Sequence, residues 1–212
     1  MDPTLIYKHF PGLTDGQRAR IGALGALYAD WNQKINVISR KDIDNLYENH
    51  VLHSLTIAAF LGELPAGTGF LDVGTGGGFP GIPLAIFYPE CRFHLIDRVG
   101  KKLRVAQAVA EAVGLENVTF QHGDVGECHH RYSYVVSRAV MPLNDLWRLV
   151  RRNVDGRTSL HGAYSPGLVC LKGGDIEAES RGIHEPVIEY PVCEFISEPR
   201  FETKEIIYIP LK

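Results

Sequence analysis

Cysteine is scarce in this sequence, and long apolar runs are missing. Four cysteines stand far apart among the 212 residues, and none forms a CxxC pair: Cys91, Cys128, Cys170 and Cys193. This spacing argues against a zinc site or a disulfide framework, so we expect reduced thiols and no bound metal. No apolar stretch approaches the roughly 20 residues that cross a bilayer, and residues 1–10 lack the pattern of a signal peptide. We therefore expect a cytoplasmic protein.

Charge of one sign is not in excess either. The formal net charge of −3 gives no overall attraction to nucleic acid, so any surface for a polyanion must be a local patch. Residues 92–104 contain five bases and one acid, and residues 148–157 contain four bases and one acid. These stretches are candidate phosphate contacts, although a solvated helix face is the commoner role for most individual basic residues.

The hydrophobic pattern changes near residue 65. Before it, Thr14 and Gln17 have the spacing of a capping box, and apolar residues follow at helical intervals as far as Trp31. A second helical pattern covers about 42–61. We therefore predict a helical N-terminal extension over residues 1–65.

From residue 67 onwards, strand-like apolar runs alternate with helical stretches. The predicted strands are 70–73, 93–97, 118–120, 134–136 and 168–171, and the predicted helices are 82–87, 101–113 and 143–150. Such alternation is typical of a mostly parallel sheet with helices on both faces. The tail alternates and contains prolines, which favours a closing antiparallel pair over 187–196 and 205–209. Residues 66–212 are therefore predicted to form one α/β domain.

A glycine-rich loop follows the first of these strands, with the sequence DVGTGGGF over residues 72–79. Glycine lets the backbone turn sharply and approach a ligand closely. The positions of Gly76, Gly78 and Gly81 also satisfy GxGxxG, the fingerprint of dinucleotide-binding proteins. The glycines alone therefore predict a nucleotide-like cofactor without deciding which one.

Two aspartates near the loop bear on that choice. Asp72 precedes Gly74 by two residues and completes DxGxG, where an acid can hold the amino group of a methionine moiety or orient the loop; the alternative is a carboxylate that only caps the loop. Asp97 ends the next strand, where it can accept hydrogen bonds from ribose hydroxyls, but NAD sites use the same device and a turn residue is the alternative. Asp72 thus favours S-adenosylmethionine over NAD.

The loop continues as FPGIP over residues 79–83, and with this extension it resembles the signature of the glucose-inhibited division protein B family, also called RsmG. Further stretches agree in the same order: 31–36, 50–55, 95–98 with Lys101 and Lys102, 137–139 and 171–173. Members of that family methylate N7 of a guanine in small-subunit (16S) ribosomal RNA. The resemblance implies a class I S-adenosylmethionine-dependent methyltransferase fold: a Rossmann-like, seven-stranded, mostly parallel sheet with an antiparallel C-terminal strand.

The resemblance also implies a set of cofactor contacts. The family's contacts carry over to Gly74, Phe79, the pair Val125-Gly126 and Arg138. With the loop and the two aspartates, the predicted cofactor-binding set is Asp72, Gly74, Thr75, Gly76, Phe79, Asp97, Val125, Gly126 and Arg138. The pair often ends in an acid in the family, whereas Gly126 offers only its backbone. His53 stands where the family commonly has aspartate, so the role of that aspartate does not transfer.

No catalytic triad is evident, which suits attack by guanine N7. That nitrogen has a free lone pair and needs no deprotonation, so the main task is in-line positioning, and we name no general base. Arg138 is predicted to be the catalytic residue, as the polar group nearest the reacting centre. Because guanine N7 must stay free, a phosphate or the cofactor carboxylate is a better partner for Arg138 than the base. The alternative role for Arg138 is an ion pair at the end of a strand.

The substrate implied is small-subunit ribosomal RNA, free or within a small ribosomal subunit, bound by a monomer. The predicted RNA contacts follow strand ends, where ligands dock in open α/β sheets: Arg98, Lys101, Lys102 and Lys172, with weaker candidates in Lys34, Arg40 and Lys41. Three alternatives stay open: a methyltransferase of a small molecule or protein, an NAD-dependent oxidoreductase, and a non-catalytic RNA-binding protein.

Overall fold

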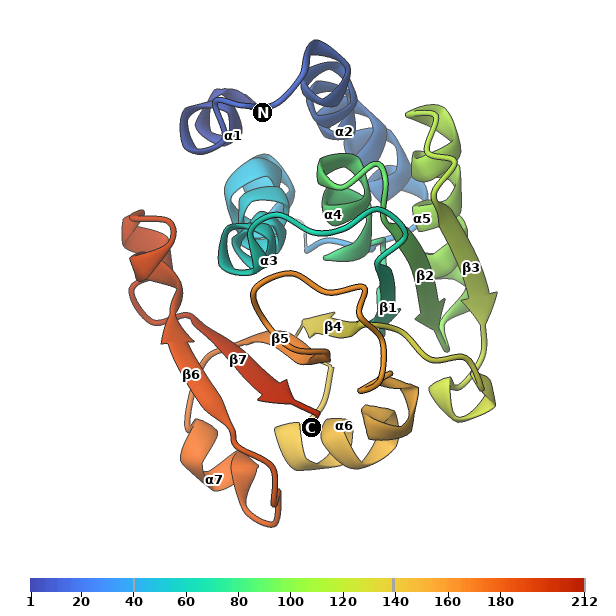
Figure 1. Cartoon of the computed structure of the whole chain (residues 1–212). Helices are drawn as coiled ribbons and strands as arrows, with labels where there is room; N and C mark the ends of the chain where they lie inside the picture. The colour runs from blue at the N-terminus through green and yellow to red at the C-terminus, as the bar shows by residue number, and fades with distance from the viewer. Residues whose placement is uncertain (40, 139, 212) are drawn as a thin grey trace.

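The computed structural model describes residues 1–39, 41–138 and 140–211 as one sheet between two layers of helices (Figure 1). The strands are β1 (Gly69–Val73), β2 (Arg92–Asp97), β3 (Val118–His122), β4 (Tyr134–Arg138), β5 (Gly167–Lys172), β6 (Ile188–Pro191) and β7 (Glu205–Pro210). Their order in the sheet is β3-β2-β1-β4-β5-β7-β6. Strands β1 to β5 pair in parallel, and β7 is antiparallel to both β5 and β6. The predicted fold class is confirmed, including the antiparallel pair at the C-terminus.

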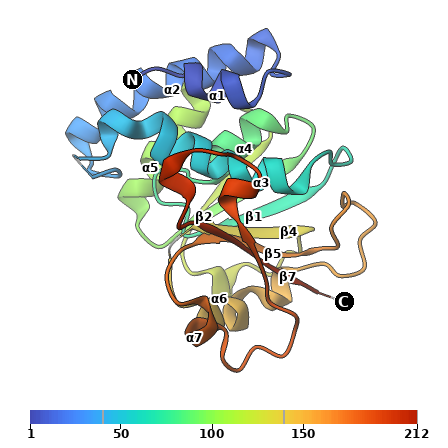
Figure 2. The ribbon, with the colours of Figure 1, turned by 90° about the vertical axis from the view of Figure 1, so that its left-hand side faces the viewer.

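Helices cover both faces of this sheet. They are α1 (Thr4–His9), α2 (Asp15–Lys34), α3 (His53–Leu61), α4 (Gly81–Phe87), α5 (Gly100–Ala112), α6 (Leu143–Val150) and α7 (Ile176–Ser180). Helices α1 to α5 lie on one side of the sheet, and α6 and α7 lie on the other (Figure 2). None of the helices within the described residues is long and apolar enough to span a membrane.

Alternation along the strands builds a separate core on each face. In β1, Phe70 packs into the core under α1 to α5, whereas its neighbour Leu71 packs into the core under α6. Successive side chains of a strand point to opposite faces. A strand that is covered on both faces therefore has consecutive apolar residues, which enter the two cores in turn. The N-terminal helices contribute Ile6, Ile21 and Tyr28 to the first core, which therefore joins residues before and after the predicted boundary near residue 65.

The segment 42–61 is not the continuous helix that its pattern predicts. It consists of a short 3-10 turn (Ile43–Asn45), a π-helical turn (Tyr47–Leu52) and α3. In the π-helical turn, the carbonyl of Asn49 accepts a hydrogen bond from Arg138 Nη1 at 3.2 Å. That donor lies 89 residues away, so the apolar spacing of the segment could not reveal the irregularity. Irregular turns of this kind are frequent at functional sites.

Other local predictions agree with the structure. Thr14 caps α2 and Gln17 completes the capping box: the Gln17 amide donates to Thr14 Oγ1 at 3.2 Å, and the Thr14 amide donates to Gln17 Oε1 at 2.9 Å. Helices α1 and α7 were not predicted, because six and five residues are too few for a helical period to emerge.

The strand order places a crevice beside β1. Strands β2 and β3 lie on one side of β1, and β4 and β5 lie on the other. The connections after β1 and β4 therefore diverge at their carboxyl ends, and in open α/β sheets ligands bind at this point.

Candidate active site

The glycine-rich loop leaves β1 in a conformation that glycine alone adopts readily. Gly74 and Gly76 have φ values of +69° and +57°, which cost a residue with a Cβ about 1–2 kcal/mol. The amides of Gly74 and Thr75 both donate to the carbonyl of Ile96, at 2.9 and 3.2 Å. These bonds hold the loop against the end of β2.

Asp72 is fully buried beneath this loop. Its Oδ2 accepts hydrogen bonds from Thr75 Oγ1 at 2.6 Å and from the Gly81 amide at 2.8 Å. A Cβ at position 81 would lie 2.7 Å from the same oxygen, so glycine at that position permits the contact. Burial raises the pKa of Asp72 to about 7. Of the roles considered from the sequence, this geometry favours a carboxylate that holds the loop together from below.

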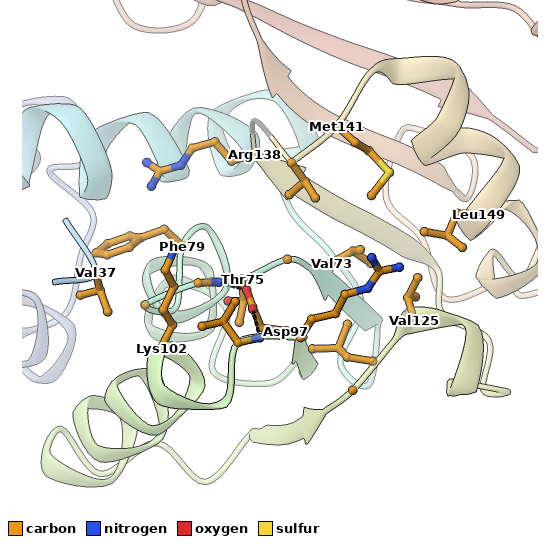
Figure 3. Close-up of a pocket in the computed structure, with 18 residues that line it drawn as sticks. Val37, Val73, Thr75, Phe79, Asp97, Lys102, Val125, Arg138, Met141 and Leu149 are labelled. Atoms are coloured by element: carbon orange, nitrogen blue, oxygen red, sulfur yellow. Dashed lines mark hydrogen bonds between the residues drawn. The ribbon is translucent and has the colours of Figure 1, made fainter. Parts of the chain in front are cut away.

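Asp97 binds the same loop from the end of β2. Its Oδ2 accepts from the Gly76 amide and its Oδ1 from the Val99 amide, both at 2.7 Å. Each carboxylate oxygen has a second lone-pair site, and Asp97 lines the cavity beside the loop (Figure 3). The carboxylate can therefore accept further hydrogen bonds from a ligand.

That cavity has a volume of about 480 Å³, within the range of small-molecule sites. It lies at the carboxyl ends of β1, β2 and β4. The structure brings seven of the nine predicted cofactor residues together in its wall: Gly74, Thr75, Gly76, Phe79, Asp97, Val125 and Arg138. The residues that sequence reasoning missed are mainly apolar, such as Val37, Met141 and Leu149. Their spacing carries no signal that distinguishes a cavity wall from core.

This cavity suits an adenosyl group joined to an amino acid. Apolar walls from Ile96 and Val125 can enclose a base, and the Asp97 carboxylate can accept from ribose hydroxyls. A Cβ at Gly76 would meet no atom within 4 Å, so this part of the loop leaves room for a ligand against the backbone.

Gly126 contributes less than predicted. Its amide donates to Asp124 Oδ1 at 2.6 Å, and its carbonyl accepts from Arg152 Nη2. Only Val125 of the predicted pair reaches the cavity wall. The nearby acid is Asp124, which also forms an ion pair with Arg98. The hydrogen bond from the Gly126 amide is the main cause that lowers the pKa of Asp124, and the ion pair with Arg98 lowers it further.

Arg138 extends from the end of β4 to the π-helical turn. Its Nη1 donates to the Asn49 carbonyl, and its Nη2 donates to His50 Nδ1 at 2.8 Å. The guanidinium lies 5.3 Å from the centre of the Phe79 ring, a cation–π contact. Burial lowers the pKa of Arg138 to about 10, which leaves it charged at neutral pH.

His50 is neutral beside this arginine. Burial, and then the charge of Arg138, lower its pKa to about 4. Because its Nδ1 accepts from Arg138, the proton of the neutral ring must be on Nε2. Among the described residues, no group of three or more His, Cys, Asp and Glu side chains is arranged to hold a metal.

The predicted RNA contacts differ in their surroundings. Arg98 and Lys102 lie at the rim of the cavity, and Lys101 is exposed on α5. The side chain of Lys172 is 8% exposed, forms an ion pair with Glu179 and donates to the Met141 carbonyl at 2.9 Å, so a phosphate would compete with those partners. Two residues singled out from the sequence, Arg40 and Ala139, lie outside the described residues.

Tyr28 of α2 ties the N-terminal extension to the loop. Its fully buried hydroxyl donates to the Gly77 carbonyl at 2.7 Å. Tyr28→Phe leaves this carbonyl without its partner, so we expect the free energy of unfolding to fall by about 1–3 kcal/mol and the affinity for an adenosyl ligand to fall as the loop loosens. Denaturant titration and calorimetry measure the two effects.

Tyr88→Phe is the matched control for Tyr28→Phe. The buried Tyr88 hydroxyl donates to the Gly62 carbonyl at 2.6 Å, away from the loop. A comparable loss of stability with unchanged ligand affinity is expected. Equal affinity losses in both variants would contradict a specific role of Tyr28.

The chain is similar to known proteins in sequence and in structure. The family described as "rRNA small subunit methyltransferase G" matches residues 17–163. Proteins named "Ribosomal RNA small subunit methyltransferase G" are similar over nearly their whole length. The one from Phocaeicola vulgatus is 50% identical over 98% of this chain and 98% of its own, and the one from Bacteroides thetaiotaomicron is 52% identical over 96% and 98%.

Solved structures agree with the architecture. An S-adenosylmethionine complex of a MtNAS mutant has a TM-score of 0.58 at 14% identity, over 92% of this chain and 76% of its own. A SAM-dependent methyltransferase from Aquifex aeolicus has a TM-score of 0.54 at 14% identity, over 81% and 98%. At such identities the likeness concerns the fold alone.

Proposed function

The chain belongs to the family of rRNA small subunit methyltransferase G, and from this membership we propose that its glycine-loop cavity serves methyl transfer to N7 of a guanine in small-subunit ribosomal RNA. The chain is an S-adenosylmethionine-dependent methyltransferase. The observation that supports the choice of site is the convergence of the loop, Asp97 and Arg138 on one cavity at the switch point of the sheet.

We assign the cofactor contacts from the cavity wall. The Asp97 carboxylate accepts from the ribose hydroxyls, and Val125 packs against the adenine. The backbone of Gly74, Thr75 and Gly76 surrounds the amino acid portion. Asp72 acts from below, through its bonds to Thr75 and Gly81. Gly126 holds the turn that carries Val125 through its bond to Asp124.

The reaction makes a limited demand on the side chains. When bound, S-adenosylmethionine would supply a methyl group on a sulfonium sulfur; attack by N7 would break the carbon–sulfur bond and pass the positive charge to the methylated guanine. The N7 lone pair is available without a proton transfer, so no general base is required. The residues orient the two reactants and exclude water. Arg138 has the most suitable position, because its guanidinium is held by the π-helical turn and the glycine-rich loop and lines the cavity.

The RNA approaches along the rim that bears Arg98 and Lys102, and along α5, on which Lys101 is exposed. Such side chains bind phosphates without reading sequence. Lys172 contributes only if its ion pair with Glu179 opens. We place the reaction in the cytoplasm, where small ribosomal subunits occur, and we propose that the chain acts as a monomer, which sedimentation analysis tests.

The activity is tested on small ribosomal subunits from cells that lack the protein. The subunits are incubated with the purified chain and S-adenosylmethionine, and N7-methylguanosine is mapped in their RNA. We expect methylation of one guanine that is unmodified before incubation, with naked RNA and complete subunits assayed in parallel. An unchanged set of N7-methylguanosines in both substrates would refute the proposal.

A further inference from the structure

A second cavity lies behind Arg138. Its volume is about 570 Å³, and Arg138 lines both this cavity and the one beside the glycine loop. Its walls come from the π-helical turn and the start of α3, from the end of β5, and from the segment before β7. The two cavities therefore meet at the guanidinium that we place nearest the reacting atoms.

Three polar atoms in the first of these walls have no hydrogen-bond partner among the described residues. They are Asn49 Oδ1, His50 Nε2 and His53 Nε2, and all three are buried. A buried polar atom left without a partner costs about 1–3 kcal/mol, and such atoms are rare enough to require a reason. Three of them within five residues, two on an irregular turn and one at the start of α3, point to a ligand that supplies the missing partners.

The hydrogen-bonding roles of two of these atoms are determined by their neighbours. Asn49 Nδ2 donates to Asp42 Oδ1 at 3.0 Å, so the free oxygen of that amide is an acceptor. His50 Nδ1 accepts from Arg138, so its free Nε2 carries a proton and is a donor. The wall thus offers one acceptor and one donor from adjacent residues.

The same cavity also has an aromatic wall. His53 stacks on Phe201, with ring centres 5.4 Å apart and an interplanar angle of 25°. Burial, followed by the charge of Arg138, lowers the pKa of His53 to about 3. Outside this aromatic pair, Arg200 is exposed and Lys204 is partly exposed, and both line the cavity. Base contacts inside and cations outside match the parts of a nucleotide.

We propose that this second cavity receives the guanine that is methylated, extruded from its RNA strand. The proposal rests on the proposed function and names the subsite of its substrate. Asn49 Oδ1 accepts from N1–H of the guanine, His50 Nε2–H donates to O6, and Arg200 and Lys204 bind the adjoining phosphates. Because the three free atoms have no exposed surface, the π-helical turn must shift toward the cavity as the base enters, with the bonds of Asn49 to Asp42 and of His50 to Arg138 kept.

This arrangement selects guanine once the base is oriented. Methylation requires N7 to face the glycine-loop cavity, past Arg138. In that orientation adenine presents an amino donor where guanine has O6, and an unprotonated N1 where guanine has N1–H. Both contacts would then be mismatched, and a site built for hydrogen bonds discriminates strongly against a ligand that cannot make them.

The first test titrates the full chain, saturated with S-adenosylhomocysteine, with guanosine 5′-monophosphate and with adenosine 5′-monophosphate. Imidazole signals are followed by NMR. We expect guanosine monophosphate to shift the signals of His50 and His53 and to bind about tenfold more tightly than adenosine monophosphate. The exposed His130 serves as an internal control and should not move. Absence of shifts at His50 and His53, or equal shifts with both nucleotides, overturns the proposal.

The second test uses Asn49→Leu and His53→Phe. In His53→Phe, the phenylalanine keeps a ring against Phe201. This variant is therefore expected to fold, and it keeps the test decisive if Asn49→Leu does not fold. In both, we expect the KM for small subunits or the dissociation constant of guanosine monophosphate to rise about tenfold, with unchanged affinity for S-adenosylhomocysteine. The activity of the wild-type chain separates failure of the proposed subsite from failure of the proposed function. If the wild-type chain methylates a guanine while both folded variants retain its kinetics, the subsite is wrong and the function stands; if the wild-type chain methylates none, both fall.

Discussion

Gly76→Leu is expected to abolish S-adenosylmethionine binding. Gly76 lines the glycine-loop cavity, and no atom lies within 4 Å of the position that its Cβ would take. A leucine side chain would therefore extend into space that we assign to the cofactor. We expect the dissociation constant to rise at least about 100-fold, equivalent to about 2.7 kcal/mol. Isothermal titration calorimetry with S-adenosylmethionine measures this effect.

The control for Gly76→Leu is Gly62→Leu. Gly62 ends α3 with a φ of +67°, against +57° at Gly76, and it also has no atom within 4 Å of its Cβ position. Both variants should lose stability: about 1–2 kcal/mol for Gly76→Leu, and about 1–3 kcal/mol for Gly62→Leu, because a ψ of −143° places Gly62 in a region that glycine alone adopts readily. Only Gly76→Leu should lose cofactor binding. Normal binding by a folded Gly76→Leu protein would mean that the cofactor lies elsewhere.

Arg138→Lys is expected to lower kcat at least about 100-fold while leaving the charge in place. The guanidinium donates to Asn49 and His50 from one planar group, and a lysine ammonium on a flexible chain cannot hold both with the same geometry. Misplacement by about 1 Å is enough to cost such a factor when catalysis depends on positioning. Single-turnover methylation of small subunits gives the rate of the chemical step.

Two further measurements make the Arg138→Lys result specific. Affinity for S-adenosylmethionine should change much less than kcat, and NMR of the His50 ring should report loss of the bond to Nδ1. Arg148→Lys, an exposed arginine on α6, is the control and should retain wild-type kcat. A kcat within about threefold of wild type in folded Arg138→Lys would remove Arg138 from the reacting centre.

The sequence supports much of the fold, and the comparisons decide between the functions left open. Strand-like runs alternating with helices predicted the mostly parallel sheet, and the spacing of Asp72 and Gly74 favoured a methyltransferase over a dinucleotide-dependent enzyme. The resemblance to one RNA-modifying family is confirmed by relatives that are about 50% identical over nearly the whole chain. The oxidoreductase alternative is therefore wrong.

The site was only partly predictable. Seven of nine predicted cofactor residues line one cavity. The glycine loop and Asp97 leave a local signal in the sequence, whereas Phe79, Val125 and Arg138 were predicted from the resemblance to the family. Asp72 and Gly126 lie outside the wall of that cavity, since their bonds to Thr75, Gly81 and Asp124 depend on the conformation of each turn. Lys172 was predicted to be free to bind RNA, whereas in the structure it forms an ion pair with Glu179.

The sequence by itself determined the alternation of strands and helices after residue 67, the glycine loop and the kind of cofactor, because each depends on residues that are neighbours along the chain. Only the tertiary structure decided which side chains meet. Arg138 and His50 are 88 residues apart in the sequence, and the fold brings Arg138 Nη2 to 2.8 Å from His50 Nδ1. The π-helical turn, the unpartnered polar atoms of Asn49, His50 and His53, and the cavity that they line all follow from that long-range packing.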